Sequence, residues 1–112
     1  MRAAALGQLN EVAHELVEVG ADVNYTDVAG DTPLIAASRS GHIAVVDRLL
    51  KHNADVDHAN NAGRTALTIA SAYGHLEVID CLLIDGANVH HTDNDGETPL
   101  LTALYGGKLA IV

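Results

Sequence analysis

The hydrophobic positions of this chain form helical stripes that alternate with polar, glycine-containing stretches. One stripe follows Leu34. A second occupies residues 45–50, where apolar side chains at i, i+1, i+4 and i+5 share one face of a predicted helix. This second stripe consists of Val45, Val46, Leu49 and Leu50. Leu49 has a counterpart 33 positions later at Leu82, so the pattern is periodic.

A polar phrase that ends in leucine recurs with the same period. It runs from Asp27 to Leu34, from Asn60 to Leu67 and from Asp93 to Leu100. The glycine that follows each first stripe recurs with it, at Gly41, Gly74 and Gly107. One helix pair cannot bury both of its faces alone, so neighbouring units must stack and share a core of Ala, Val, Leu and Ile. The sequence therefore predicts a solenoid.

Local signals define the elements of each unit. A threonine precedes each first helix and is expected to cap it by accepting a hydrogen bond from an amide of the first turn. These threonines are Thr32, Thr65 and Thr98. We expect the first helix to end near Ser40, and Gly41 to permit the corner into the second helix. The second helix is expected to end near Asn53 or Gly86, residue types that tolerate the left-handed conformation.

The recurring residues resemble the ankyrin repeat. They are Thr32 Pro33 Leu34, then Gly41 His42, and the run from Gly20 to Asn24. The resemblance covers essentially residues 3–112. It implies an all-α fold: an ankyrin-repeat solenoid of stacked helix-turn-helix pairs joined by β-hairpin-like finger loops.

Three departures from the family pattern bear on the fold. Ile35, Thr68 and Leu101 stand where the family usually carries a histidine, so a customary buried imidazole hydrogen bond is absent. Ala66 replaces the usual proline. In the first repeat, Gly7 precedes Leu16 by one residue more than Gly41 precedes Leu49, so we expect a looser or differently turned corner there.

The repeats make one domain over residues 1–112. Repeat 1 is partial and covers 1–26, repeat 2 covers 27–59, repeat 3 covers 60–92, and repeat 4 is partial and covers 93–112. Both ends fall inside a repeat and neither shows the polar outer face of a capping repeat. We therefore expect a segment of a longer array. The monomer is expected to fray after about Leu104 and to be capable of end-to-end association through its apolar ends.

Charge restricts the partners. Fifteen Asp and Glu oppose six Lys and Arg, for a formal charge of −9, and residues 65–107 contain six acids without a basic side chain. Nucleic acid binding requires neutralisation of phosphates, so it is not expected. A neutral or basic protein surface fits better as partner.

The cellular location is inferred from the apolar runs and the cysteine content of the sequence. No apolar run approaches membrane length, so no membrane partner is expected. Cys81 is the single cysteine, which rules out an intrachain disulfide and fits a reducing, cytoplasmic location, with the nucleus not excluded. Cys81 is expected to be a half-buried, inert thiol.

The histidines have structural explanations. His42 and His75 stand at the family's Gly-His corner, where we expect a local hydrogen bond at a helix start. His58 and His91 recur near the finger stems, one repeat apart. Stacked elements lie about 8 to 10 Å apart, too far for these two rings to share a zinc ion, so no metal site is predicted.

Other reactive constellations fail on register or are absent. The acids from Asp93 to Glu97 resemble part of a calcium loop. In that register His91 would be the first ligand and Thr102 the bidentate one, which neither can supply, so the segment is predicted to be a finger turn. No nucleophile elbow or phosphate-binding glycine loop occurs. We expect neither enzymatic activity nor a cofactor.

The positions left after the core, turns and caps are assigned lie at the finger tips and at the exposed end of each first helix, along one concave face. The resemblance implies that partners bind there. The predicted contacts are Thr26, Val28, Ala29, Asp31, Arg39, Ser40, Ala59, Asn61, Ala62, Arg64, Ala72, Tyr73, Thr92, Asn94, Asp95, Glu97 and Tyr105. Arg39, Arg64, Tyr73 and Tyr105 are the expected anchors, because Tyr and Arg give large contacts at modest entropic cost.

These features favour a protein–protein interaction module. The alternative is a passive spacer that positions other domains of a larger protein, and this alternative stays open because a scaffold does not specify a function. The family resemblance also implies a modification. Asn24, with Leu16 eight positions earlier, matches the pattern of ankyrin repeats hydroxylated on asparagine.

Overall fold

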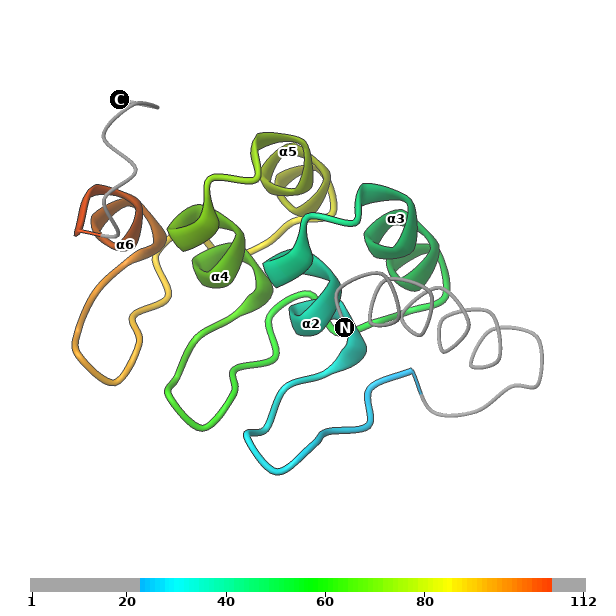
Figure 1. The fold of residues 1–112 in the computed structure, drawn as a ribbon, viewed down its shortest axis with the longest axis horizontal. Coiled ribbons are helices and arrows are strands. Elements are labelled where there is room, and N and C mark those ends of the chain that lie inside the picture. Colours follow the sequence, from blue (N-terminus) through cyan, green and yellow to red (C-terminus); the bar gives the residue numbers. More distant parts are fainter. Residues whose placement is uncertain (1–22, 106–112) are drawn as a thin grey trace.

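The computed structural model describes residues 23–105, which contain five α-helices and no β-strand. Four of them form two pairs and the fifth follows, with a long loop before each pair and before the fifth (Figure 1). They are α2 (Pro33–Ser40), α3 (Ile43–Lys51), α4 (Ala66–Tyr73), α5 (Leu76–Ile84) and α6 (Pro99–Tyr105). The expectation of an all-α solenoid of helix pairs is confirmed.

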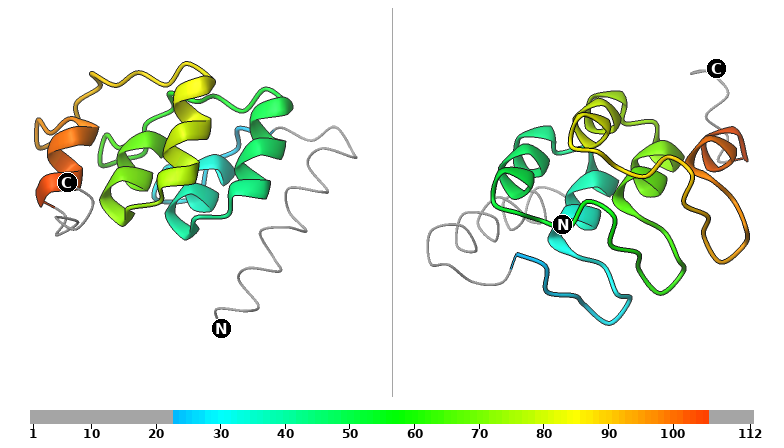
Figure 2. Two further views of the ribbon diagram at one scale, coloured as in Figure 1. Left: turned by 90° about the horizontal axis from the view of Figure 1, so that it is seen from above. Right: turned by 180° about the vertical axis from the view of Figure 1, so that it is seen from behind.

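The helices form two layers. The first helices α2, α4 and α6 lie side by side, and the second helices α3 and α5 lie side by side behind them (Figure 2). The long loops project together from one side of the stack (Figure 1). Because each helix packs against its counterpart one repeat away, the loops are held at regular intervals.

The predicted caps and corners are present. Thr32 Oγ1 accepts a hydrogen bond from the amide of Ile35 at 3.2 Å, and Thr65 does the same from Thr68 at 3.3 Å. Thr98 Oγ1 accepts from the amide of Leu101 at 3.4 Å. Gly41 and Gly74 end α2 and α4 with φ of 75° and 71°, as the sharp corners require.

The second helices also end as predicted. Asn53 has φ of 70° after α3, and Gly86 has φ of 88° after α5. The Asn53 and Gly86 amides donate to carbonyls of the last helical turn, at Leu50 and Leu83 respectively. These bonds satisfy carbonyl groups that would otherwise lack a partner at the helix end.

The core is aliphatic, as expected, and lies between the two helical layers. It consists of Leu34, Ile35, Ala37, Val45, Val46, Leu49, Ala54, Ala66, Leu67, Ile69, Ala70, Val78 and Leu82. At the position of the missing family histidine, Ile35 is buried and apolar. Thr68 instead satisfies its buried hydroxyl on the hydroxyl of Thr65, 3.2 Å away.

Several predictions for the chain ends lie outside the described residues. These are the altered corner after Gly7, the first partial repeat up to residue 22, and the fraying expected beyond Leu104, of which only Tyr105 falls within the description. The repeat boundaries and the oligomeric state stay predictions.

Candidate functional site

The loops that carry the predicted contacts share one construction. In the first loop, Asp27 Oδ1 accepts hydrogen bonds from the amides of Ala29 and Asp31, both at 2.9 Å. The Asp27 amide in turn donates to the Asp31 carbonyl at 3.0 Å. Asn60 and Asp93 make the corresponding bonds in the next two loops. Each tip is therefore a closed turn, and its conformation is fixed without a partner.

Neighbouring tips are also bonded to one another. The Asn61 amide donates to the carbonyl of Ala29 at 2.9 Å, and its side-chain Nδ2 donates to the carbonyl of Val28 at 3.0 Å. Asn94 repeats both bonds, to the carbonyls of Ala62 and Asn61. We call this run of bonds the finger ladder. The side-chain amides of Asn61 and Asn94, predicted as partner contacts, already donate within it.

Three histidines bond across repeats as well. His58 Nε2 donates to the Gly30 carbonyl at 3.1 Å, and His91 Nε2 donates to the Gly63 carbonyl at 2.8 Å. His75 Nε2 donates to the carbonyl of Arg39 at 3.0 Å. Since a carbonyl only accepts, Nε2 carries the proton in each ring.

The expected local bond at the helix start is therefore wrong for the Gly-His corner. Neither His42 nor His75 makes a side-chain capping bond to its own helix. The His75 ring instead lies over Gly41, where an added Cβ would come within 2.7 Å of it. The corner histidine thus connects consecutive repeats, and the glycine beneath it makes room for the ring.

Asp31 is not free for a partner, contrary to expectation. It is buried, and its Oδ2 accepts from Arg39 Nη1 at 2.9 Å while its Oδ1 accepts from Asn60 Nδ2 at 2.8 Å. A buried carboxylate needs such partners to offset its desolvation. Asp31 consequently fixes the position of Arg39, whose own side chain remains partly exposed.

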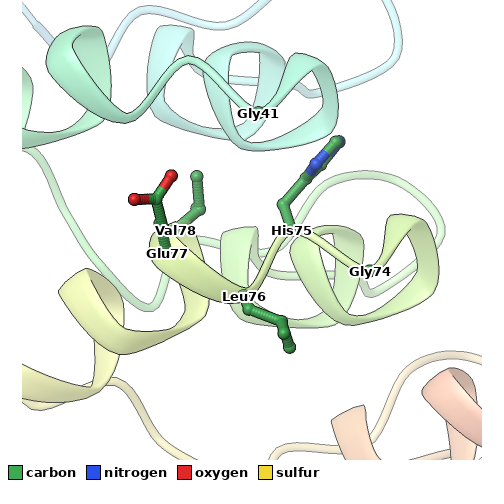
Figure 3. Close-up of a pocket in the computed structure, with 6 residues that line it drawn as sticks. All are labelled: Gly41, Gly74, His75, Leu76, Glu77 and Val78. Atoms are coloured by element: carbon green, nitrogen blue, oxygen red, sulfur yellow. The ribbon is translucent and has the colours of Figure 1, made fainter. Parts of the chain in front are cut away.

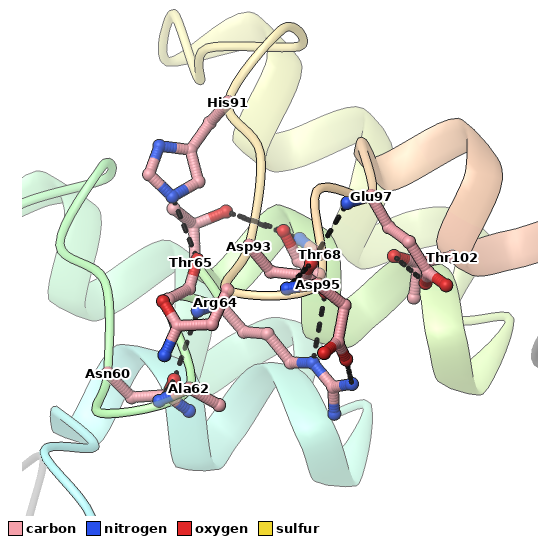
Figure 4. A network of polar contacts seen from close by, with 12 residues as sticks. Asn60, Ala62, Arg64, Thr65, Thr68, His91, Asp93, Asp95, Glu97 and Thr102 are labelled. Carbon is pink, nitrogen blue, oxygen red and sulfur yellow. Dashed lines mark hydrogen bonds and ion pairs between the residues drawn. The ribbon is translucent and has the colours of Figure 1, made fainter.

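Arg64 lies in a second charged network, at the base of the last described loop (Figure 4). Its Nε is 3.4 Å from Asp93 Oδ2, and its Nη2 is 3.9 Å from Asp95 Oδ2. Glu97 accepts a long hydrogen bond from the hydroxyl of Thr102 at 3.5 Å. Both predicted arginine anchors are therefore held in place by carboxylates of the chain itself.

Asp93 gives this network a pH dependence. Burial alone raises the pKa of the Asp93 carboxyl, but hydrogen bonds from the backbone amides of Glu97 and Asp95, with Arg64, outweigh it and lower the pKa below its usual value. A folded-state pKa below the unfolded one stabilises the fold above the unfolded pKa, about 3.9. That stabilisation is lost as the pH falls through the folded-state pKa.

Asp93→Asn tests this contribution. Asparagine makes the same turn at Asn60, so the turn is retained and the charge is lost. At pH 7 we expect a decrease of about 1 kcal/mol in the free energy of unfolding. The decrease is small for a buried charge because Arg64 is partly exposed, so water screens its attraction to Asp93. Urea unfolding should show the gap between variant and wild type closing below about pH 4. A gap of equal size at pH 7 and pH 3 would contradict the assignment.

The remaining predicted contacts divide by exposure. Exposed residues are Thr26, Val28, Ala29, Ser40, Asn61, Ala62, Tyr73, Thr92, Asn94 and Asp95. Partly exposed residues are Arg39, Ala59, Arg64, Ala72 and Glu97. The backbone of Tyr105 lies at the end of α6, and its side chain falls outside the description. Tyr73 stacks on His75 with ring centroids 6.2 Å apart, at the end of α4 next to the corner.

A pocket of about 300 Å³ lies at that corner (Figure 3). Its lining is Gly41, Gly74, His75, Leu76, Glu77 and Val78. His75 points toward Gly41, whereas Leu76 points to the opposite side. The two ionisable groups of the lining are a carboxylate and an imidazole whose Nε2 is already bonded to Arg39. The lining contains no serine, threonine, cysteine or lysine side chain.

Cys81 is half-buried, as expected. Burial raises the pKa of its thiol, and the carboxylates of Asp47 and Asp85 raise it further. The thiol is therefore protonated at neutral pH and a poor nucleophile. Within residues 23–105 no group of three or more His, Cys, Asp or Glu side chains is placed to hold a metal ion. None of the helices described there is long and apolar enough to cross a bilayer.

Asn24, the predicted hydroxylation site, is engaged with the next repeat. Its Oδ1 accepts a hydrogen bond from the amide of Asp55 at 2.7 Å. Leu16, the other part of that pattern, lies outside the described residues. Hydroxylation stays a prediction.

The sequence alone did not identify the residues that form bonds between repeats. A signal was present, because Asn61 and Asn94, like His58 and His91, are identical at one-repeat spacing. Identity of a polar side chain at one-repeat spacing indicates a bond within the scaffold. Variation does not by itself identify a partner contact, because Asp31, Arg64 and Glu97 differ at one shared position and Asp31 is buried.

A family model described as ankyrin repeats (3 copies) matches residues 1–93. A search of curated proteins found no match to the chain.

Proposed function

Because the chain belongs to the ankyrin-repeat family, whose repeats generally act as protein–protein interaction modules, we propose that it binds a partner protein across its finger tips and the exposed ends of its first helices. The single observation that supports this most is the finger ladder. It presents exposed side chains on tips whose backbone is already fixed. Such preorganisation reduces the entropy lost on binding.

The contacts proposed to bind are those whose side chains reach solvent. Ala29, Ala62 and Asp95 occupy the same place on successive tips. Tyr73 adds an exposed aromatic ring at the end of α4, and aromatic rings are enriched among the residues that contribute most binding energy. Arg39 and Arg64 are held by Asp31 and Asp93, so they offer a partner guanidinium groups of fixed position.

Charge supports a neutral or basic partner. Along the described tips and first-helix ends, the acids outnumber the two arginines Arg39 and Arg64. Asp31 and Asp93 are buried and paired with these arginines, which leaves Asp27, Asp95 and Glu97 as the acidic excess. A basic surface would gain from this excess, and its association should slow at high salt.

A steric substitution tests the proposed face. Ala62 is exposed on the middle tip, and Ala44 is exposed on α3, in the opposite layer. We expect Ala62→Arg to reduce the affinity for a captured partner by about tenfold or more, because a central contact is displaced. Ala44→Arg makes the same chemical change and should leave affinity within about twofold. Partners can be captured from a cell extract on the immobilised chain, identified by mass spectrometry and measured by calorimetry.

The spacer alternative gives another result. If the chain is a passive spacer, any protein that it captures should bind the Ala62→Arg and Ala44→Arg variants with the same affinity. Equal affinities for the two variants, with unchanged circular dichroism, would contradict binding at the tips. A cytoplasmic location stays a prediction beside this proposal.

A further inference from the structure

The pocket at the corner between the second and third repeats has walls from two repeats that are already stacked. Gly41 lies on one side, and the segment from Gly74 to Val78 lies on the other. His75, Glu77 and Val78 extend toward the preceding repeat (Figure 3). The space of about 300 Å³ persists although α4 packs against α2 and α5 against α3. Stacking of one repeat on the next therefore leaves this pocket open.

His75 offers a hydrogen-bond acceptor to the pocket. Its Nε2 donates to the carbonyl of Arg39 at 3.0 Å, so Nδ1 of the neutral ring has a free lone pair. A Cβ on Gly41 would lie 2.7 Å from this Nδ1, which places the nitrogen at the pocket wall. Among residues 23–105 no donor is bonded to it. Tyr73 stacks on the ring with 9° between the two planes. The ring therefore presents an acceptor of fixed position.

Glu77 gives the pocket a negative charge. Its side chain is exposed on the first turn of α5, and it forms no ion pair within the described range 23–105. The same position of the preceding repeat is Ala44, so the repeat scaffold does not require a carboxylate there. The positive end of the α5 dipole is equivalent to about half a unit charge, which the full charge of Glu77 exceeds. The pocket is therefore net negative.

These groups define the class of guest. The free polar atoms of the lining side chains, His75 Nδ1 and the Glu77 carboxylate, accept hydrogen bonds, and Val78 adds an apolar wall. An anion would lie against the Glu77 carboxylate and be repelled. A guest with a cationic head and an apolar stem fits both parts of the lining, and Lys and Arg side chains have this form. Tyr73 is also an exposed contact of the proposed partner face, so the pocket adjoins that face.

We propose that this corner pocket binds a Lys or Arg side chain of the partner protein, with the charged head against Glu77 and the stem against Val78. The source of the side chain rests on the proposed function, whereas the preference of the pocket for a cation does not. A partner that lies over Tyr73 has the pocket beside it. The two claims can therefore be tested separately.

Small probes test the preference without a partner. Isotope-labelled 112-residue chain is titrated with n-butylguanidinium and, at equal ionic strength, with butyrate, while amide shifts are recorded by nuclear magnetic resonance. We expect n-butylguanidinium to move the amide signals of Gly41, His75 and Glu77 saturably, and butyrate to leave them in place. The absence of saturable changes with n-butylguanidinium would overturn the proposal. An equal or larger response to butyrate would do so too, because it would identify an anion site at the start of α5.

Two matched variants locate the charge. Glu77→Gln and Asp80→Asn each remove one exposed carboxylate of α5, but only Glu77 lines the pocket. We expect Glu77→Gln to weaken n-butylguanidinium binding at least about fivefold, and Asp80→Asn to change it by less than about twofold. Circular dichroism confirms that each variant is folded. Equal weakening by both variants would indicate attraction by the general charge of the chain and would contradict the pocket.

The captured partner tests the source of the side chain. Glu77→Gln should weaken its binding at least about threefold, in addition to the effect of Ala62→Arg at the finger tip. If Ala62→Arg weakens the partner and Glu77→Gln does not, the finger-tip function stands and the partner side chain in the pocket is refuted. If Glu77→Gln weakens the partner and Ala62→Arg does not, the pocket stands and binding at the tips is refuted.

Discussion

Gly63→Ala is expected to destabilise the chain more than Gly96→Ala, although the two glycines have the same backbone conformation. Both have φ of +77°. A side chain in that region costs about 1 to 2 kcal/mol at either site. At Gly63 a Cβ would also lie 2.5 Å from Asn94 Oδ1 and 2.8 Å from the Asn94 backbone nitrogen. At Gly96 it would meet nothing within 4 Å.

The difference between the two variants measures the contact between fingers. Asn94 cannot simply rotate away, because its backbone amide is bonded to the Ala62 carbonyl. We expect an additional loss of about 1 to 3 kcal/mol in the free energy of unfolding for Gly63→Ala, typical of overpacking against a fixed neighbour. Urea unfolding of both variants gives the comparison. Equal losses would contradict the finger ladder.

Leu67→Ala is expected to lower the free energy of unfolding strongly, and it can be compared with the same truncation one repeat later. Leu67 is 3% exposed beneath α6, and we expect its truncation to cost about 2 to 5 kcal/mol through lost burial and a residual cavity. That is a large part of the stability of a short array. The effect should appear as a lower urea midpoint or as loss of cooperative unfolding.

Leu100→Ala is the matched control, because Leu100 holds the same repeat position and the same place in its helix. It is 70% exposed, so its truncation should change the free energy of unfolding by less than about 0.5 kcal/mol. If the two variants lose the same stability, the described exposure of Leu100 is wrong.

The repeat period predicts most of the fold. Helix ends, caps and corners follow from local chemistry at Thr32, Gly41 and Asn53, and each was confirmed. Such features need only the residues within one turn of themselves. The contacts between repeats depend instead on which atoms meet 28 to 36 residues apart, as in the bond from His58 to Gly30 or from His75 to Arg39. A single sequence does not specify those pairs.

The candidate site was predicted less well for the same reason. In the sequence, Asp31 has the character of a variable, polar residue at a loop tip. The residues next to it in the sequence do not indicate that Asn60 and Arg39 enclose it. Arg64 likewise finds Asp93 one loop later. Elimination placed the buried Asp31 among the contacts, and it did not separate side chains that are free to face a partner from those that bind the next repeat.

The claim that partners bind at the finger tips is tested most directly by nuclear magnetic resonance. Amide shifts of the labelled chain are recorded while a captured partner is added. The account predicts that the largest changes cluster at Ala29, Ala62, Asp95 and Tyr73, with little change along α3. Changes concentrated on α3, or absent from all three tips at saturation, would contradict it.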